Sequence, residues 1–104
     1  MKRVIVLFCL VPGFLFAAGD AAKGKDVYAA KCKACHGAAG EGNQGLAKAM
    51  KVELRPLGSK EVQARKDDDL KKVVTEGTGK MKPIAGVAGA DLDNAIAFVR
   101  TFKH

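Results

Sequence analysis

Four stretches of the chain carry small or apolar residues at the spacing of an amphipathic helix. The first spans residues 21–33, where Asp20 is a suitable N-cap and the recurring positions are Gly24, Val27, Tyr28 and Lys31. A glycine inside a helix costs about 1 kcal/mol relative to alanine, so we expect another helix to approach closely at Gly24. Residues 46–51 predict a second, short helix.

The third predicted helix runs from residue 67 to about residue 76. Leu70, Val73 and Val74 form its apolar stripe, and the three acids at 67–69 complement the helix dipole in the first turn. Three consecutive carboxylates are also compatible with a metal site. A solvated charge cluster at a helix N-terminus accounts for them without a metal.

The last predicted helix starts after Asp91, its expected N-cap, and ends near residue 102. Its stripe consists of Leu92, Ala95, Ile96 and Val99, flanked by Phe98 and Phe102. The notch at Gly24 beside Tyr28 offers a partner, and we expect Ala95 and Phe98 to pack across it. The alternative is that the first and last helices face only the centre of the fold.

Three stretches interrupt the helical pattern. Residues 37–45 contain four glycines, which permit tight turns and close backbone approach. A phosphate-binding loop is the competing interpretation, but no Gly-Lys-Ser/Thr follows and no strand precedes. Residues 52–66 are mixed, with a turn at 56–58, and residues 77–83 form a loop bounded by Gly77 and Pro83.

The chain begins with a targeting pattern. A basic start, an apolar run over residues 4–16 and small residues at 17–19 are typical of a secretory signal peptide, which we place at residues 1–19. The run is shorter than the roughly 20 apolar residues of a spanning helix, although an uncleaved anchor is the alternative. Cys9 would be removed with the peptide. The remaining domain, residues 20–104, would then stay outside the cytoplasm, in the periplasm, without spanning the membrane.

One short motif carries the chemistry. Cys32 and Cys35 are three residues apart, and His36 follows directly, which is the pattern of a covalent c-type haem attachment site. On a helix these three side chains point to one side, so two thiols can bond the macrocycle while the imidazole reaches its iron. A redox-active dithiol would need a preceding strand, and a zinc site a fourth ligand, for which His104 is a poor candidate.

Composition agrees with a bound prosthetic group. Without the leader, about 85 residues remain, with Tyr28, Phe98 and Phe102 as their aromatics. So small a core usually needs an additional stabilising group, and a haem supplies the missing apolar surface. The full chain has 18 basic and 11 acidic residues; loss of Lys2 and Arg3 leaves +5, and two ionised propionates would leave about +3. Interleaved charges and the absence of an aromatic-arginine platform argue against nucleic-acid binding.

Methionine is the expected sixth ligand of the iron. Met81 stands in the loop at 77–83, which could lie over the distal face, and its thioether is a soft donor found in His/Met haem sites. Met50, on the predicted short helix, is the rival. Most methionines simply fill gaps in a core, which is the alternative for both.

The chain resembles the class I cytochromes c. The resemblance rests on Gly-Lys-x-x-Tyr-x-x-x-Cys-x-x-Cys-His-Gly at 24–37, Gly-x-Met-x-Pro at 79–83 and the terminal Ala-x-Ala-Phe-Val helix, and it covers the whole predicted mature chain. It implies an all-α fold of about four helices around one covalently bound haem c, with the N- and C-terminal helices crossing. It also implies non-enzymatic electron transfer between redox partner proteins. His36 and Met81 would be the axial ligands.

One departure from the family concerns the proximal histidine. Many relatives place a proline carbonyl against its Nδ1–H, whereas this chain has no proline between His36 and Pro56. We expect a carbonyl near residues 44–46 to substitute, because such an acceptor orients the ring and raises its basicity. Arg55 and Lys60 are candidates to bind the propionates.

Partner binding is the last expectation. Positive side chains adjoin both iron-binding segments, and we expect some of them to steer a monomeric carrier onto acidic partner surfaces: Lys31, Lys33, Lys80 and Lys82. General solubility is the alternative. Two other functions stay open: a haem subunit of a larger oxidoreductase, and a ligand-binding haem protein if Met81 does not bind iron.

Overall fold

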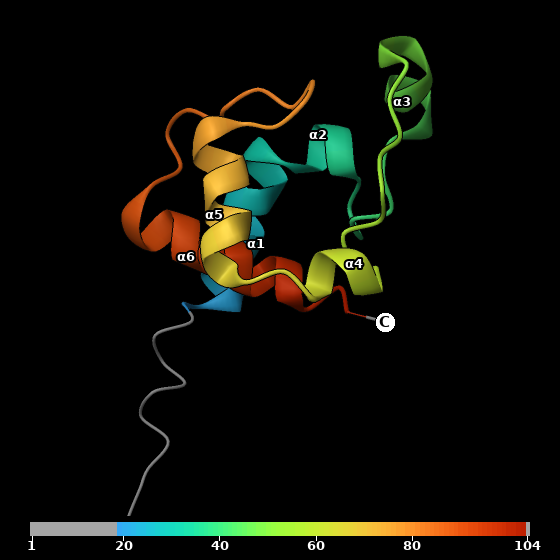
Figure 1. Ribbon diagram of the computed structural model, residues 1–104. Coiled ribbons are helices and arrows are strands. Elements are labelled where there is room, and N and C mark those ends of the chain that lie inside the picture. The colour runs from blue at the N-terminus through green and yellow to red at the C-terminus, as the bar shows by residue number, and fades with distance from the viewer. Residues whose placement is uncertain (1–18, 104) are drawn as a thin grey trace, which may run out of the picture.

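The computed structural model describes residues 19–103 and contains six helices and no strand in that range (Figure 1). The helices are α1 (Ala21–Lys31), α2 (Lys33–His36), α3 (Gln44–Met50), α4 (Lys60–Gln63), α5 (Asp67–Glu76) and α6 (Gly89–Arg100). The expected all-α fold is confirmed, and the two shortest helices account for the excess over the expected four. None of the described helices is both long and apolar enough to cross a membrane. Residues 1–18 of the expected signal peptide, which include Cys9, and His104 lie outside the described residues.

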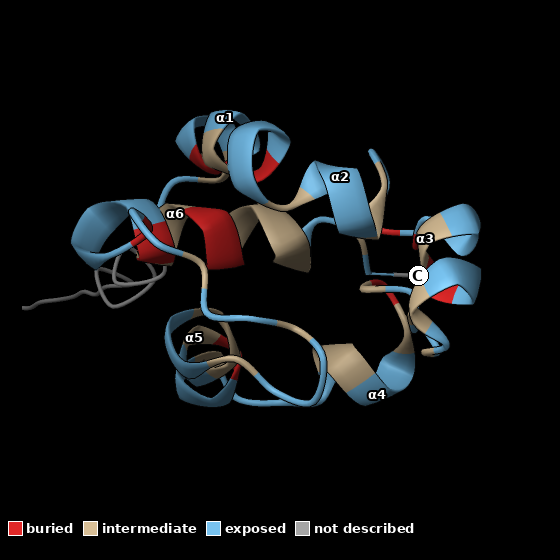
Figure 2. Cartoon of the chain, turned by 90° about the horizontal axis from the view of Figure 1, so that it is seen from above, coloured by how far each residue is buried: buried red, intermediate tan, exposed pale blue. Residues whose placement is uncertain are grey.

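The first and last helices form the main packing contact of the fold. Figure 2 shows buried residues concentrated where α1 and α6 face each other. A Cβ on Gly24 would overlap the carbonyl oxygen of Asn94 and lie 3.0 Å from Cβ of Phe98. The predicted close approach at Gly24 is therefore confirmed, with Asn94 rather than Ala95 nearest to the notch.

An aromatic cluster fills the end of this helix pair. The ring centroids of Tyr28, Phe98 and Phe102 lie 5.1 to 5.3 Å apart in tilted and edge-to-face arrangements. Tyr28 is 2% exposed. The aromatics that remain after the predicted leader thus act as one unit that joins α1 to the C-terminal end of α6.

A second apolar cluster joins α5 to α6. Leu70, Val87, Leu92 and Ile96 are buried together, and partly buried residues surround them: Val27, Val62, Val74 and Ile84. Lys71 of α5 forms an ion pair with Asp93 of α6. These contacts place α5 and α1 on opposite sides of α6 (Figure 2). The three longest helices therefore form a bundle with α6 in the middle.

Helix boundaries follow local capping. Asp20 caps α1 as predicted, through its carboxylate and the N–H groups of Ala22 and Lys23. The predicted continuous helix over 21–33 breaks at Cys32, whose φ of −122° leaves the helical range. The second predicted helix begins two residues early, since Asn43 accepts a hydrogen bond from the N–H of Leu46.

The expected cap at Asp91 is wrong. Ala88 precedes α6, and Asp91 lies in its first turn, where a carboxylate complements the helix dipole. The helix that starts at Asp67 has the predicted bounds, and Gly77, with φ of 79°, ends it. The mixed region at 52–66 contains α4, which Ser59 caps through its hydroxyl oxygen.

Long polar side chains attach α4 to the bundle. Arg100 of α6 donates to the carboxylate of Asp67 and to the carbonyls of Gln63 and Arg65. The Gln63 amide in turn donates to the carbonyls of Leu57 and Val99. This network holds the segment that leads from α4 into α5 against the end of α6.

Candidate haem-binding site

A cavity of about 640 Å³ opens between α2, the segment after α3 and the loop that follows α5. Cys32, Cys35, His36, Met50 and Met81 all line it. Half of the other lining residues are aliphatic and come from five segments: Leu46, Val52, Leu54, Leu57, Val62, Val73 and Ile84. The volume is within the usual range for a small-molecule or cofactor site, about 300–1,000 Å³.

Cys32 separates α1 from α2, and this break sets the direction of the attachment motif. The N–H groups of Cys35 and His36 both donate to the Cys32 carbonyl, which closes a tight turn. The following loop folds back: Gly42 N–H donates to the His36 carbonyl and Asn43 N–H to the Cys35 carbonyl. The Asn43 amide also donates to the Ala34 carbonyl at 3.2 Å. The motif is therefore fixed from both sides although α2 has only four residues.

The imidazole of His36 has one buried nitrogen without a partner. Its Nδ1 is buried and has no hydrogen-bond partner among the described residues. The expectation that a carbonyl near residues 44–46 accepts a hydrogen bond from this nitrogen is therefore wrong, because these residues lie in α3, where backbone carbonyls accept from the N–H groups of the helix. Burial lowers the pKa of His36 and favours the neutral imidazole, which is the form that binds a metal.

The Cys32 thiol lacks the lowered pKa that is typical of a redox-active dithiol. Cys32 and Cys35 are not joined by a disulfide. Burial, and then the neighbouring Cys35, raises the pKa of the Cys32 thiol, whereas reactive dithiols have lowered pKa values. Within residues 19–103, no three His, Cys, Asp or Glu side chains are grouped to hold a metal ion, so the zinc alternative gains no support.

Met81 stands at the base of a tight turn, not in an extended loop. Thr78 and Met81 exchange both backbone hydrogen bonds, of 2.8 and 2.9 Å, around Gly79 and Lys80. Gly77 precedes this turn, and a Cβ there would lie 2.5 Å from the Met81 carbonyl oxygen, so only glycine fits. Ile84 N–H donates to the Val74 carbonyl and attaches the far end of the loop to α5.

Charged side chains surround the cavity unevenly. Four of the basic residues singled out in the sequence line the cavity: Lys31, Arg55, Lys80 and Lys82. Glu53 is the one acidic residue of the lining. Lys33 and Lys60 do not line the cavity. The cavity border described here is thus predominantly positive.

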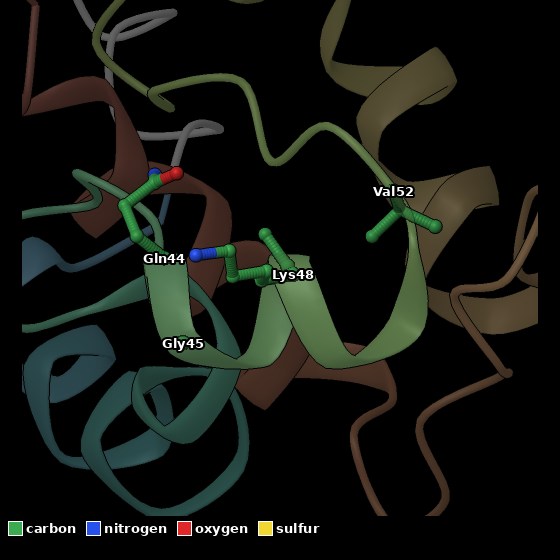
Figure 3. A pocket seen from close by; sticks show the side chains of 5 residues that line it. Gln44, Gly45, Lys48 and Val52 are labelled. Carbon is green, nitrogen blue, oxygen red and sulfur yellow. The ribbon is translucent and has the colours of Figure 1, made fainter.

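A second pocket, of about 480 Å³, lies on α3 (Figure 3). Gln44, Gly45, Ala47, Lys48 and Val52 line it. None of the residues predicted to bind iron or thioether-bonded haem belongs to it, so the candidate site is the larger cavity.

Comparison with known proteins agrees with this geometry. A family model described as cytochrome c oxidase, cbb3-type, subunit III matches residues 19–99. Cytochrome c-554(547) of Halothiobacillus neapolitanus is 38% identical over 96 residues, which cover 83% of this chain and all of that protein. A solved c-type cytochrome, KustC0563, superposes with a TM-score of 0.65 at 27% identity, covering 78% of this chain and 98% of its own.

The fold and the attachment motif therefore define a c-type cytochrome domain. The chain belongs to the cytochrome c family, in the branch named for the cbb3-type oxidase subunit. As a member of that family it carries covalently bound haem c with iron. The cavity fits this group: seven aliphatic side chains line it together with two thiols, the His36 imidazole and two methionine thioethers.

Sequence reasoning named Tyr28 and Lys80 but did not find the hydrogen bonds by which they hold the site in place. The Tyr28 hydroxyl donates to the carbonyl of Gly37, the residue after His36, at 2.6 Å. Lys80 Nζ donates to the carbonyl of Met50 at 2.7 Å. Both bonds join segments that are separated in the chain, and no local sequence pattern predicts them. Asn43 was detectable, because it is a preferred N-cap residue directly before α3.

Proposed function

We propose that this protein is a periplasmic electron carrier with one haem bonded to Cys32 and Cys35, and with His36 and Met81 as axial ligands. The supporting observation is that the Cys-x-x-Cys-His motif and the Met81 turn, 45 residues apart, line one apolar cavity. Haem iron supplies a one-electron couple when bound in such a site.

The residues of this chain account for the rest of the role. If both His36 and Met81 bind the iron, they would leave no open coordination position, and ligands such as oxygen would be excluded. A thioether from Met81 favours ferrous iron, and apolar burial opposes the additional charge of the ferric state. Both raise the reduction potential relative to a bis-histidine site. The helix bundle holds the two ligand segments in place, which keeps rearrangement during electron transfer small.

The choice of ligand is tested by spectroscopy of matched variants. The oxidised protein is expected to show a methionine-to-iron charge-transfer band that Met81→Ala abolishes and Met50→Leu retains. Carbon monoxide should bind readily only to the reduced Met81→Ala protein. A band that survives in Met81→Ala and disappears in Met50→Leu would instead assign Met50. Absence of the band from the wild type, with ready carbon monoxide binding, would favour a ligand-binding haem protein.

The positive cavity border supports docking on an acidic partner surface. Lys31, Lys80, Lys82 and Arg55 lie beside the expected haem edge and can accelerate encounter by long-range attraction. Partner reduction rates should then fall as ionic strength rises, since the Debye length shrinks to about 8 Å at physiological salt. A flat response would remove this proposal.

A second candidate is a haem subunit of a larger oxidoreductase. It is favoured by the family description, which refers to a subunit of a cbb3-type oxidase. Purification from the native membrane and soluble fractions separates the two roles, because a carrier is recovered as a free monomer and a subunit within a complex. The same preparation tests export: the mass of the mature chain should correspond to loss of residues 1–19.

A further inference from the structure

The Met81 turn and the end of α3 both line the cavity, and few contacts join these two segments. The closely packed helix pairs of the described chain are α1 with α6, α1 with α2 and α5 with α6; α3 belongs to none of these. In Figure 1, α3 stands apart from the bundle of α1, α5 and α6. Its position relative to the Met81 turn therefore depends on few contacts.

Lys80 supplies the one hydrogen bond between them. Its Nζ donates to the Met50 carbonyl at 2.7 Å, and no other hydrogen bond of the described residues joins 77–83 to α3. The Met50 carbonyl belongs to the last turn of α3, where carbonyls lack helical partners. The neighbouring N–H groups of Lys51 and Val52 are used on Ala47 and Lys48 instead. A cation at this end also complements the helix dipole.

The geometry points to Lys80 as a positioning residue for Met81. The bond links two segments that line the cavity. Its donor, Lys80, precedes Met81 in the chain, and its acceptor is Met50, the second thioether-bearing residue of the lining. By capping α3 in trans, Lys80 fixes the turn that carries Met81 and holds the Met50 backbone at the cavity border. This role rests on the proposed ligation by Met81, and it differs from the docking role because it requires the hydrogen bond and not only the charge.

Lys82 provides a matched control. It lies in the same loop, lines the same cavity and carries the same charge, but its side chain makes no hydrogen bond with any other residue of 19–103. Removing either lysine changes the electrostatic field at the site similarly. Only removal of Lys80 uncouples the Met81 turn from α3.

The test measures how easily an external ligand displaces Met81. Imidazole is titrated into the oxidised holoprotein, and loss of the methionine-to-iron band reports displacement. Lys80→Ala is expected to bind imidazole about 3- to 10-fold more tightly than the wild type, as for loss of one hydrogen bond. Lys82→Ala should change the affinity less than about 2-fold, and Lys80→Arg, which retains a cationic donor, should restore much of the wild-type value.

The outcomes separate this inference from the proposed function. Equal imidazole affinities for Lys80→Ala and Lys82→Ala, with a wild-type band present, would overturn the positioning role and leave Met81 as ligand. Absence of the band from the wild type would overturn the ligand assignment, and the positioning role with it. A second measurement uses the Met81 amide, whose N–H is bonded to the Thr78 carbonyl. Its hydrogen exchange should accelerate in Lys80→Ala and not in Lys82→Ala.

Discussion

The hydroxyl of Tyr28 donates a 2.6 Å hydrogen bond to the carbonyl of Gly37. Gly37 directly follows His36 and has φ of 85°, a backbone conformation that favours glycine. The ring of Tyr28 meanwhile contacts Phe98 and Phe102 of the C-terminal segment. One side chain therefore joins the helix pair, through its ring, to the attachment motif, through its oxygen.

Tyr28→Phe should lower the free energy of unfolding by about 1 kcal/mol, because the Gly37 carbonyl loses the tyrosine donor and keeps only the Gly40 N–H, while the ring contacts persist. Guanidinium unfolding of the holoprotein measures the change. Thr75→Val is a suitable control, since it removes an exposed hydroxyl bonded within α5 and should change stability by less than about 0.5 kcal/mol. Equal losses in the two variants would contradict a special role for the Tyr28 bond.

Tyr28 should also titrate late. Burial, assisted by the nearby Cys32 and Glu41, raises its pKa from 10.0 to about 12. The folded state then binds this proton more tightly than the unfolded state, so the contribution to stability is complete below pH 10 and is lost as the pH rises through 12. Tyr28 is the chain's single tyrosine. Phenolate absorption, with Tyr28→Phe as the blank, gives its titration directly; a midpoint near 10 would contradict this prediction.

Gly24→Ala should destabilise the fold by about 1–3 kcal/mol despite the better helix propensity of alanine. The added methyl would overlap the Asn94 carbonyl and force α1 away from α6. Gly45→Ala is the matched control: its Cβ would lie 3.4 Å from the Asn43 Oδ1, an ordinary contact. We expect a gain of about 0.5–1 kcal/mol there. Thermal unfolding of both variants measures these opposite signs.

Arg100→Ala should lower the free energy of unfolding by about 1–2 kcal/mol, because the guanidinium donates hydrogen bonds to the Asp67 carboxylate and to two backbone carbonyls. Arg65→Ala removes the same charge from an exposed side chain of the adjoining segment and should stay within about 0.5 kcal/mol. Denaturant unfolding of the two proteins decides this. Similar small losses would mean that the network at the end of α6 is energetically minor.

Local chemistry explains which features could be predicted. Asp20, Leu70 and Gly77 were readable because a cap, an apolar stripe and a helix-ending glycine each act within one or two turns. The motif at 32–36 was readable for the same reason. The family resemblance then supplied the crossing of the terminal helices, and Gly24 gave the location of the contact.

Features that depend on distant segments were not accessible. At Asp91 the capping rule failed because Gly89 and Ala90 enter the helix first. The acceptor expected for His36 failed because residues 44–46 lie in α3, where their carbonyls accept from the N–H groups of the helix. The lysine that reaches Met50 could not be distinguished by sequence from the neighbouring lysine in the same loop.

The amide of Asp20 donates to the side chain of Asn94, 74 positions later, at 2.8 Å. Closing so long a loop has an entropic cost that grows only with the logarithm of its length, yet it requires both ends of the domain to be present. During synthesis, α1 cannot form its main packing contact until α6 has been made. Shortening the polypeptide before residue 89 should therefore leave the opening helix of the domain without its main packing partner.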